Sequence, residues 1–266
     1  MTARLGHDVH GPADAPVVVL GSSLGTTRSM WDEQLPGLSA AFRVVRYDHR
    51  GHGESDVPPG PYALDDLVGD LLALLDSLGV ERAHHAGVSL GGMVAMRLAA
   101  TAPERVDRLA LVCTAAHLPA TQAWLDRAET VRASGTAAVT DAVAERWFTP
   151  SFAATARAGA LRAAMRALSA EGYAACCDAI AAMDLRPLLA AVRAPTLVVA
   201  GADDRATPPD MGRAIADAII RGGGSARMLV VDGAAHLAGV ERAGRVTDLL
   251  LEHFGALAAT DRGAHG

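Results

Sequence analysis

The sequence predicts an α/β protein, with a mostly parallel β-sheet flanked by helices and one helical insertion. Three observations carry this prediction. Short runs rich in β-branched residues alternate along the chain with stretches of helical periodicity. Several of these runs are continuously apolar, which is typical of strands buried on both faces of a parallel sheet. The alternation stops between about His117 and Val192 and then resumes.

Six runs are predicted as strands, and helices connect them. The runs are Val17–Leu20, Arg43–Tyr47, Ala83–Val88, Arg108–Cys113, Pro195–Ala200 and Arg227–Val231. The clearest helix has one apolar face, which Gly79 ends and which consists of Leu64, Leu67, Val68, Leu71, Leu72, Leu75 and Leu78. Such alternation favours right-handed crossovers between parallel strands. Ligands then bind at the carboxyl ends of the strands.

Residues 118–192 are predicted to form a helical cap. This segment is rich in Ala and Arg, favours helix throughout and holds no convincing strand. The chain returns to a buried strand at Ala194-Pro195. We therefore expect residues 1–117 and 193–266 to form the sheet core, on which residues 118–192 sit as a cap.

Composition argues against several classes of protein. The chain of 266 residues carries a net charge of −6 and no basic tract, so nucleic acid is not an expected partner. An N-terminus without an apolar signal core, and the lack of any membrane-length apolar run, predict a cytoplasmic protein without a membrane contact. The cysteines, Cys113, Cys176 and Cys177, have neither disulfide nor zinc spacing, so no metal is expected. Both chain ends, with His7, His10 and the tail after Ala258, are predicted to fray.

Ser89 is the predicted nucleophile. It stands in Gly87-Val-Ser89-Leu-Gly91, after the strand Ala83–Val88 and before the helical stretch Gly92–Ala100. A serine in a sharp strand-to-helix turn takes a strained backbone conformation, and the two glycines let neighbouring backbone pass close to it. The turn exposes the hydroxyl at the carboxyl edge of the sheet and aims the N–H of Leu90 at a developing oxyanion. The alternative is a glycine-rich turn with a bystander serine.

His236 is the predicted general base. A serine hydroxyl is a poor nucleophile at neutral pH and needs a base within hydrogen-bond reach. His236 lies directly after the last predicted strand and before the last helix, so its loop reaches the same sheet edge as Ser89. His49 and His52 fall in the turn of residues 48–55, which we interpret as a structural loop that braces the nucleophile turn.

A carboxylate must hold the imidazole ring in the right tautomer. Two adjacent candidates, Asp203 and Asp204, follow the strand Pro195–Ala200, and the chain order Ser, Asp, His fits either of them. The second oxyanion donor is expected after the strand Val17–Leu20, where the N–H of Leu24 is the candidate. The glycines of that loop are equally consistent with a plain turn.

Taken together, these segments resemble the α/β-hydrolase superfamily over nearly the whole chain. The matching motifs are Gly-Ser-Ser-Leu-Gly from Gly21, Asp-His-Arg-Gly-His-Gly-Glu-Ser from Asp48, Gly-Val-Ser-Leu-Gly-Gly from Gly87, Gly-Ala-Asp-Asp from Gly201 and Gly-Ala-Ala-His from Gly233. More narrowly, the chain is similar to the 3-oxoadipate enol-lactone hydrolases of aromatic catabolism. That resemblance rests on Ser23-Leu-Gly-Thr-Thr27 with Met30-Trp31, on Arg146-Trp-Phe-Thr-Pro150, and on Gly172-Tyr-Ala-Ala-Cys-Cys177 with Asp184-Leu-Arg186.

The resemblance implies a serine hydrolase that opens a lactone ring without a metal or an organic cofactor. Ser89, activated by His236, attacks the carbonyl, and the N–H groups of Leu24 and Leu90 hold the oxyanion. The matching family pattern has the acid three residues after a glycine, which points to Asp204. A carboxylesterase, a C–C bond hydrolase and a non-catalytic ligand-binding protein are alternatives on the same fold.

The implied substrate is a small anionic lactone, and its carboxylate needs a cation if it enters a desolvated cleft. The cap offers Arg127, Arg132, Arg146, Arg157, Arg162 and Arg166. Arg127 lies three residues after Trp124, so both share a helix face and present a planar fork beside an apolar wall. Arg146, next to Trp147, is the second candidate. The alternative for each arginine is to solvate the outer face of the cap.

Overall fold

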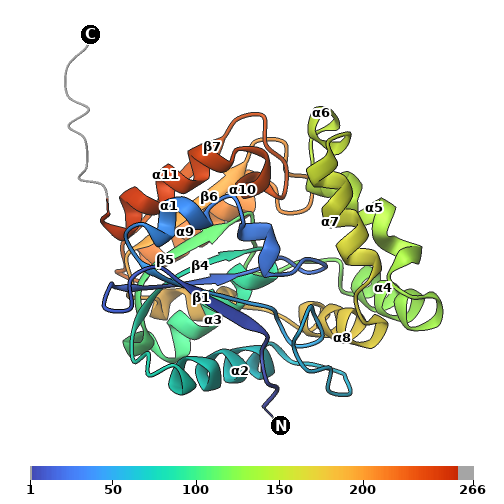
Figure 1. The fold of residues 1–266 in the computed structure, drawn as a ribbon, viewed down its shortest axis with the longest axis horizontal. Helices are drawn as coiled ribbons and strands as arrows, with labels where there is room; N and C mark the ends of the chain where they lie inside the picture. Colours follow the sequence, from blue (N-terminus) through green and yellow to red (C-terminus); the bar gives the residue numbers. More distant parts are fainter. Residues whose placement is uncertain (1, 257–266) are drawn as a thin grey trace.

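One mostly parallel sheet forms the centre of the structure (Figure 1). The computed structural model describes residues 2–256, and within them the sheet has seven strands in the order β1-β3-β2-β4-β5-β6-β7. The strands are β1 (His7–His10), β2 (Val17–Gly21), β3 (Arg43–Tyr47), β4 (Ala83–Val88), β5 (Val106–Val112), β6 (Thr196–Gly201) and β7 (Ala226–Val231). β1 runs antiparallel to β3, and the other pairs are parallel. The predicted α/β class is confirmed.

All six predicted strands are present, but the sequence does not predict β1. The expectation of a frayed N-terminus is therefore wrong at His7 and His10. Four residues that alternate between exposed and half-buried positions are too short a pattern to recognise. Asp8 holds the strand in place, because its carboxylate accepts hydrogen bonds of 2.9 and 2.8 Å from Arg46 on β3. The tail after Ala258 lies outside the described residues.

Helices cover both faces of the sheet. α2 (Leu64–Ser77), α3 (Leu90–Thr101), α9 (Pro209–Arg221) and the 3-10 helix Arg186–Ala191 pack together on one side. α1 (Leu35–Ser39) and α11 (Ala243–Phe254) pack on the other. The short α10 (Ala238–Glu241) precedes α11, and two further 3-10 helices span Arg28–Trp31 and Pro103–Arg105. Most of the predicted leucine face is buried in α2, which ends before Gly79 at φ +66°.

Residues 118–192 contain helices and no β-strand. The helices are α4 (Thr121–Ser134), α5 (Ala137–Trp147), α6 (Pro150–Ala153), α7 (Ala156–Arg166) and α8 (Ala170–Ala181), followed by the 3-10 helix described above. An isolated β-bridge joins His117 to Asp184 at the base of this insertion. In Figure 1 the five α-helices lie together to the right of the sheet.

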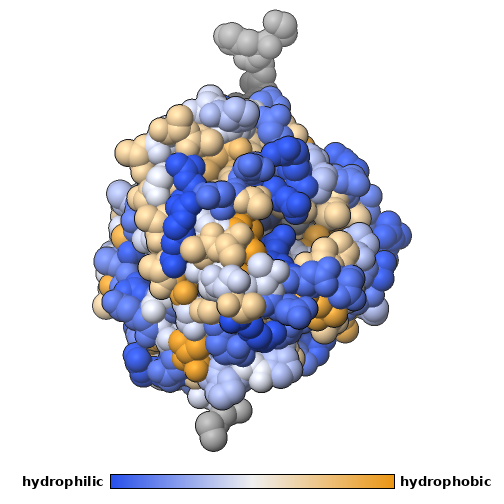
Figure 2. Space-filling model, turned by 90° about the vertical axis from the view of Figure 1, so that its right-hand side faces the viewer, coloured by the Kyte–Doolittle hydropathy of each residue, from blue (hydrophilic) through white to orange (hydrophobic). Residues whose placement is uncertain are grey.

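The outer face of the inserted helices has a mixed surface. Figure 2 looks onto this side of the molecule and shows hydrophilic residues between the apolar ones. The apolar side chains on this face therefore form separate spots, not one continuous patch. Across residues 2–256, every helix falls short of the length and apolarity that crossing a bilayer requires.

Besides His236, five histidines are buried: His49, His52, His84, His85 and His253. Burial disfavours a charged imidazolium, so it lowers the pKa of each ring. The pKa falls to about 3 for His49 and to about 4 for His85 and His253. These three rings are therefore neutral in the folded protein at pH values where a free histidine is charged.

We predict that the protein loses stability as the pH falls from about 6.5 towards about 4. In this window the unfolded chain binds protons that the folded chain excludes, and each such histidine lowers the free energy of unfolding by about 1.4 kcal/mol per pH unit. Urea unfolding at several pH values measures the slope. His85→Leu should reduce the slope of unfolding free energy against pH by the contribution of about one proton, which is about 1.4 kcal/mol per pH unit. His7→Gln, at an exposed ring, should leave the slope unchanged. Equal slopes for wild type and His85→Leu would contradict this account.

Candidate active site

Ser89 lies in the turn between β4 and α3, in a strained conformation. Its φ is +53°, in the left-handed region that residues with a side chain rarely adopt. Neighbouring strand ends hold it there. The Ser89 N–H donates to the carbonyl of Val112 at 3.1 Å, and Thr114 Oγ1 donates to the Ser89 carbonyl at 2.7 Å. Stored strain of this kind is found at functional sites, where the surrounding structure over-determines it.

The two glycines of the motif allow backbone to pack on backbone. A Cβ at Gly87 would lie 2.2 Å from the carbonyl carbon of Gly91, and a Cβ at Gly91 would lie 2.3 Å from the carbonyl oxygen of Gly21. Both positions thus exclude any side chain. The turn therefore lies directly against the end of β2, from which the next loop starts.

His236 and Asp204 meet at the same edge of the sheet. His236 Nδ1 lies 2.9 Å from Asp204 Oδ2, and both side chains are buried. Thr207 Oγ1 donates to the same oxygen at 2.7 Å, while the N–H groups of Ala206 and Thr207 donate to Oδ1. Asp203, the competing candidate, is exposed. No sequence pattern pointed to Thr207, whose part in the site depends on this contact.

The hydrogen bonds of Asp204 keep it ionised and orient the ring of His236. Burial alone would raise the pKa of Asp204, but the charge and the hydrogen bond of His236, together with the donors of Thr207, outweigh burial and lower it. A carboxylate can only accept, so the proton of the neutral ring lies on Nδ1. Nε2 is then free to accept a proton from a hydroxyl.

The backbone N–H groups of Leu24 and Leu90 are available to a ligand. Within residues 2–256 neither has a hydrogen-bond acceptor, whereas their neighbours do. The N–H of Ser23 donates to the sulfur of Met30, and that of Gly25 donates to His52 Nε2 at 3.1 Å. Two unpaired donors beside Ser89 are the arrangement that stabilises an oxyanion.

His49 and His52 hold the loop that carries Leu24. His49 Nε2 donates to the carbonyl of Ser22 at 2.9 Å, and His52 Nε2 accepts from Gly25. The two rings therefore bind this loop on both sides of Leu24. The turn of residues 48–55 was expected to brace the nucleophile turn. It reaches that turn only indirectly, because the Gly91 N–H donates to the same Ser22 carbonyl at 3.0 Å.

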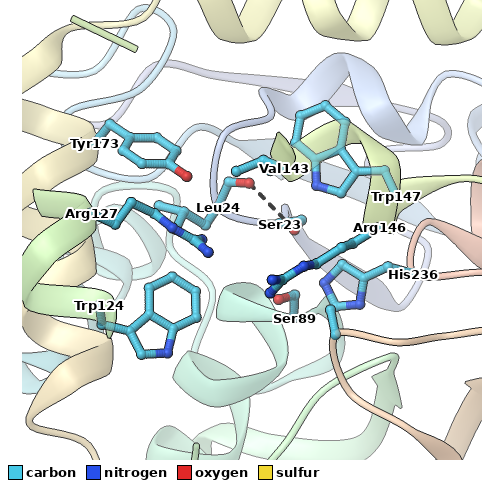
Figure 3. Close-up of a pocket in the computed structure, with 11 residues that line it drawn as sticks. Ser23, Leu24, Ser89, Trp124, Arg127, Val143, Arg146, Trp147, Tyr173 and His236 are labelled. Atoms are coloured by element: carbon cyan, nitrogen blue, oxygen red, sulfur yellow. Dashed lines mark hydrogen bonds between the residues drawn. The ribbon is translucent and has the colours of Figure 1, made fainter. Parts of the chain in front are cut away.

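One pocket collects most of the predicted site residues (Figure 3). It is lined by Ser23, Leu24, Ser89, Trp124, Arg127, Val143, Arg146, Trp147, Tyr173, Ala206 and His236. Asp204 and Leu90 are absent from this lining. The sheet core and the inserted helices thus each contribute one wall. Within residues 2–256, no group of three His, Cys, Asp or Glu side chains is arranged to hold a metal ion.

Two arginines of the pocket differ from the other arginines of the insertion. The other arginines have protein acceptors: Arg132 pairs with Glu171 and Asp178, Arg157 with Glu33, Arg166 with Asp141 and Arg186 with Asp184, while Arg162 donates to the Ala153 carbonyl. Among the described residues, no carboxylate lies within ion-pair distance of Arg127 or Arg146. The Arg127 guanidinium stacks on Trp124 instead, 4.3 Å from the ring centroid. Both cations therefore remain available to an anion.

Tyr173 is a pocket residue that the sequence did not single out for the site. Its side chain is fully buried, and its hydroxyl has no hydrogen-bond partner among residues 2–256. Figure 3 shows this hydroxyl on the pocket side of the ring, towards Arg127. A buried hydroxyl without a partner is costly. A ligand oxygen would remove that cost.

The family model of the α/β hydrolase fold matches residues 16–243. The chain belongs to the α/β-hydrolase family. The matched range includes Ser89, Asp204 and His236, and it spans the inserted helices as well as the sheet.

Two similar proteins are enol-lactonases. The chain is 38% identical to 3-oxoadipate enol-lactonase 2 of Acinetobacter baylyi over 240 residues, which cover 90% of this chain and 88% of that protein. The crystal structure of the enol-lactonase from Burkholderia xenovorans has a TM-score of 0.90 at 39% identity, over 94% of this chain and 96% of that one. A thermophilic esterase from Thermogutta terrifontis has a TM-score of 0.86 at 30% identity, over 93% and 92%.

We predict that Asp204→Asn lowers kcat for an activated ester by roughly 10⁴-fold, because the amide permits the wrong imidazole tautomer. Asp203→Asn is the matched control one residue upstream, and its exposed side chain predicts a change of less than about threefold. Steady-state hydrolysis of p-nitrophenyl acetate measures both. The opposite ranking would assign the acid to Asp203.

Proposed function

We propose that this protein is a 3-oxoadipate enol-lactonase, a serine hydrolase that opens the lactone ring through an acyl-enzyme. The observation that carries the proposal is one pocket that combines Ser89 and His236 with two arginines that have no carboxylate partner among the described residues. The hydrolytic residues supply the chemistry, and the arginines fit a substrate with an ionised carboxymethyl group. The two similar enol-lactonases support this choice of substrate.

In the first half-reaction, Ser89 Oγ attacks the lactone carbonyl while His236 Nε2 takes the hydroxyl proton. Asp204 stabilises the imidazolium that forms. The negative charge on the former carbonyl oxygen is held by the N–H groups of Leu24 and Leu90. Collapse of this intermediate breaks the bond between the carbonyl carbon and the ring oxygen. The ring oxygen leaves as an enolate and takes the proton from His236, which returns the imidazole to its neutral form. The resulting enol then becomes the ketone by tautomerisation.

In the second half-reaction, His236 takes a proton from water, which attacks the acyl-enzyme ester. The bond to Ser89 Oγ breaks and the serine regains its proton from His236. The product, 3-oxoadipate, carries the original carboxylate and a second one formed in this step. Neither half-reaction requires a redox step, a metal ion or an organic cofactor.

The inserted helices act in this proposal as a cap domain. Residues 118–192 form the cap, and residues 1–117 and 193–266 form the core that carries the hydrolytic residues. The cap supplies Trp124, Arg127, Arg146 and Trp147 to the pocket, which makes it the part that selects the substrate. An ionised lactone crosses bilayers poorly, which fits action in the cytoplasm.

Side-by-side kinetics test the proposed activity. We expect kcat/KM to be highest for the enol-lactone, lower for p-nitrophenyl acetate and lowest for a meta-cleavage product. Ser89→Ala should lower kcat on the lactone by about 10⁴- to 10⁶-fold while folding is retained, since the catalytic residues act as one unit. A preference for the neutral ester would favour a carboxylesterase, and a preference for the meta-cleavage product would favour a C–C bond hydrolase. Full activity of Ser89→Ala would exclude the acyl-enzyme.

Arg127 is expected to bind the substrate carboxylate. Removing one partner of a buried charge pair costs about 2–5 kcal/mol, so Arg127→Ala should lower kcat/KM for the lactone by roughly 30-fold or more. Neutral p-nitrophenyl acetate should be hydrolysed almost as well as before. Arg166→Ala is the control in the cap, because that arginine is exposed and pairs with exposed Asp141. If both substrates suffer equally from Arg127→Ala, the residue is structural.

A further inference from the structure

Glu241, the last residue of α10, is a buried carboxylate that the proposed chemistry does not use. Its side chain is 7% exposed. Among residues 2–256, no arginine or histidine side chain lies within ion-pair distance of it. A buried charge without a cation is costly unless hydrogen bonds satisfy it. The groups that satisfy Glu241 therefore indicate what it holds together.

The hydrogen-bond donors to Glu241 come from two separate parts of the chain. The N–H of Ala235, the residue before His236, donates to Oε1 at 2.8 Å. Thr149, which follows α5 in the cap, donates its N–H to Oε2 at 3.1 Å and its hydroxyl to the same oxygen at 2.6 Å. One carboxylate thus joins the loop of the general base to the cap.

The residue after His236 is tied to the same part of the cap. The N–H of Leu237 donates to the carbonyl of Trp147 at 2.9 Å. Both peptide neighbours of His236 are therefore fastened to residues 147–149, one directly and one through Glu241. Residues 146 and 147 also line the pocket, and Figure 3 shows Arg146 and Trp147 on the same side of the pocket as His236.

We propose that Glu241 is a positioning residue that sets the backbone of His236 against the cap. Asp204 orients the ring through Nδ1, but the distance from Nε2 to Ser89 also depends on where the main chain of residues 235–237 lies. A misplacement of about 1 Å at a reacting group costs on the order of 10²-fold in rate. The inference rests on the proposed role of His236 as the base.

Glu241→Gln tests the role with little change of shape. The amide offers one acceptor oxygen to three donors and turns an NH₂ group towards at least one of them, so the loop loses part of its anchor. We expect kcat to fall by roughly 10- to 100-fold for both the lactone and p-nitrophenyl acetate. KM should stay within about twofold for either substrate, because the pocket walls remain. A loss confined to KM would overturn the proposal.

A double-mutant cycle with His236→Ala separates positioning from general structure. The readout is the rate at which a fluorophosphonate ester labels Ser89, a single irreversible event that can be followed even when slow. Glu241→Gln should slow labelling by the same factor as kcat in the wild-type background. It should have less than about a twofold effect once His236 is absent. If the full factor persists in His236→Ala, Glu241 does not act through the base.

Two further variants complete the test. Leu71→Ala, on the buried face of α2, should lower Tm while kcat stays within about twofold, which excludes a general effect of lower stability. Thr149→Val removes only the hydroxyl donor and should give a smaller loss with the same dependence on His236. Wild-type labelling by His236→Ala itself would overturn the assigned base, and with it this role of Glu241. The labelling rate of His236→Ala alone thus tests the assigned base, whereas an effect of Glu241→Gln that persists in the His236→Ala background argues only against the role of Glu241.

Discussion

Close packing of backbone at the nucleophile turn is the constraint on which the rest of the site depends. Ser89 adopts φ +53°, so β4 can turn directly into α3. This turn requires glycine at positions 87 and 91, where a Cβ would lie 2.2 and 2.3 Å from backbone atoms. The same contact brings the Gly91 N–H within 3.0 Å of the Ser22 carbonyl. One steric condition thus places Ser89 beside the loop that offers the Leu24 N–H.

Both arginines that line the pocket come from the inserted helices. Away from the pocket, Arg28 pairs with Asp48 and Arg46 pairs with Asp8. Among the arginines of residues 118–192, five have protein acceptors, while Arg127 rests on an aromatic ring and Arg146 has no carboxylate near it within the described chain. A protein of net charge −6 therefore places two arginines without a carboxylate partner in the described chain at this pocket. That distribution favours an anion in the pocket more than the net charge does.

The fold was predictable from the sequence because its six central runs are long and apolar enough to reveal strands buried on both faces. β1 was not, since its position depends on the pairing of Asp8 with Arg46, far away in the chain. The strand-to-helix turn at Ser89 was predictable because it is a local pattern. Asp204 is buried and Asp203 is exposed, but the sequence around two adjacent aspartates does not show which of them is buried. Tyr173, Thr207 and Glu241 acquire their roles from tertiary contacts, such as that between Glu241 and Thr149, 92 residues apart.

The two anchors of His236 suit a base that must act twice. In the proposed reaction the same nitrogen takes a proton from Ser89 and later one from water, while the leaving group and the water exchange places in the pocket. Asp204 alone would keep the ring oriented on a loop free to drift. The bonds of residues 235 and 237 to residues 147–149 remove that freedom. Because Arg146 and Trp147 belong to the same segment, any shift of this wall carries the base with it, and the base keeps its place relative to that side of the substrate through both half-reactions.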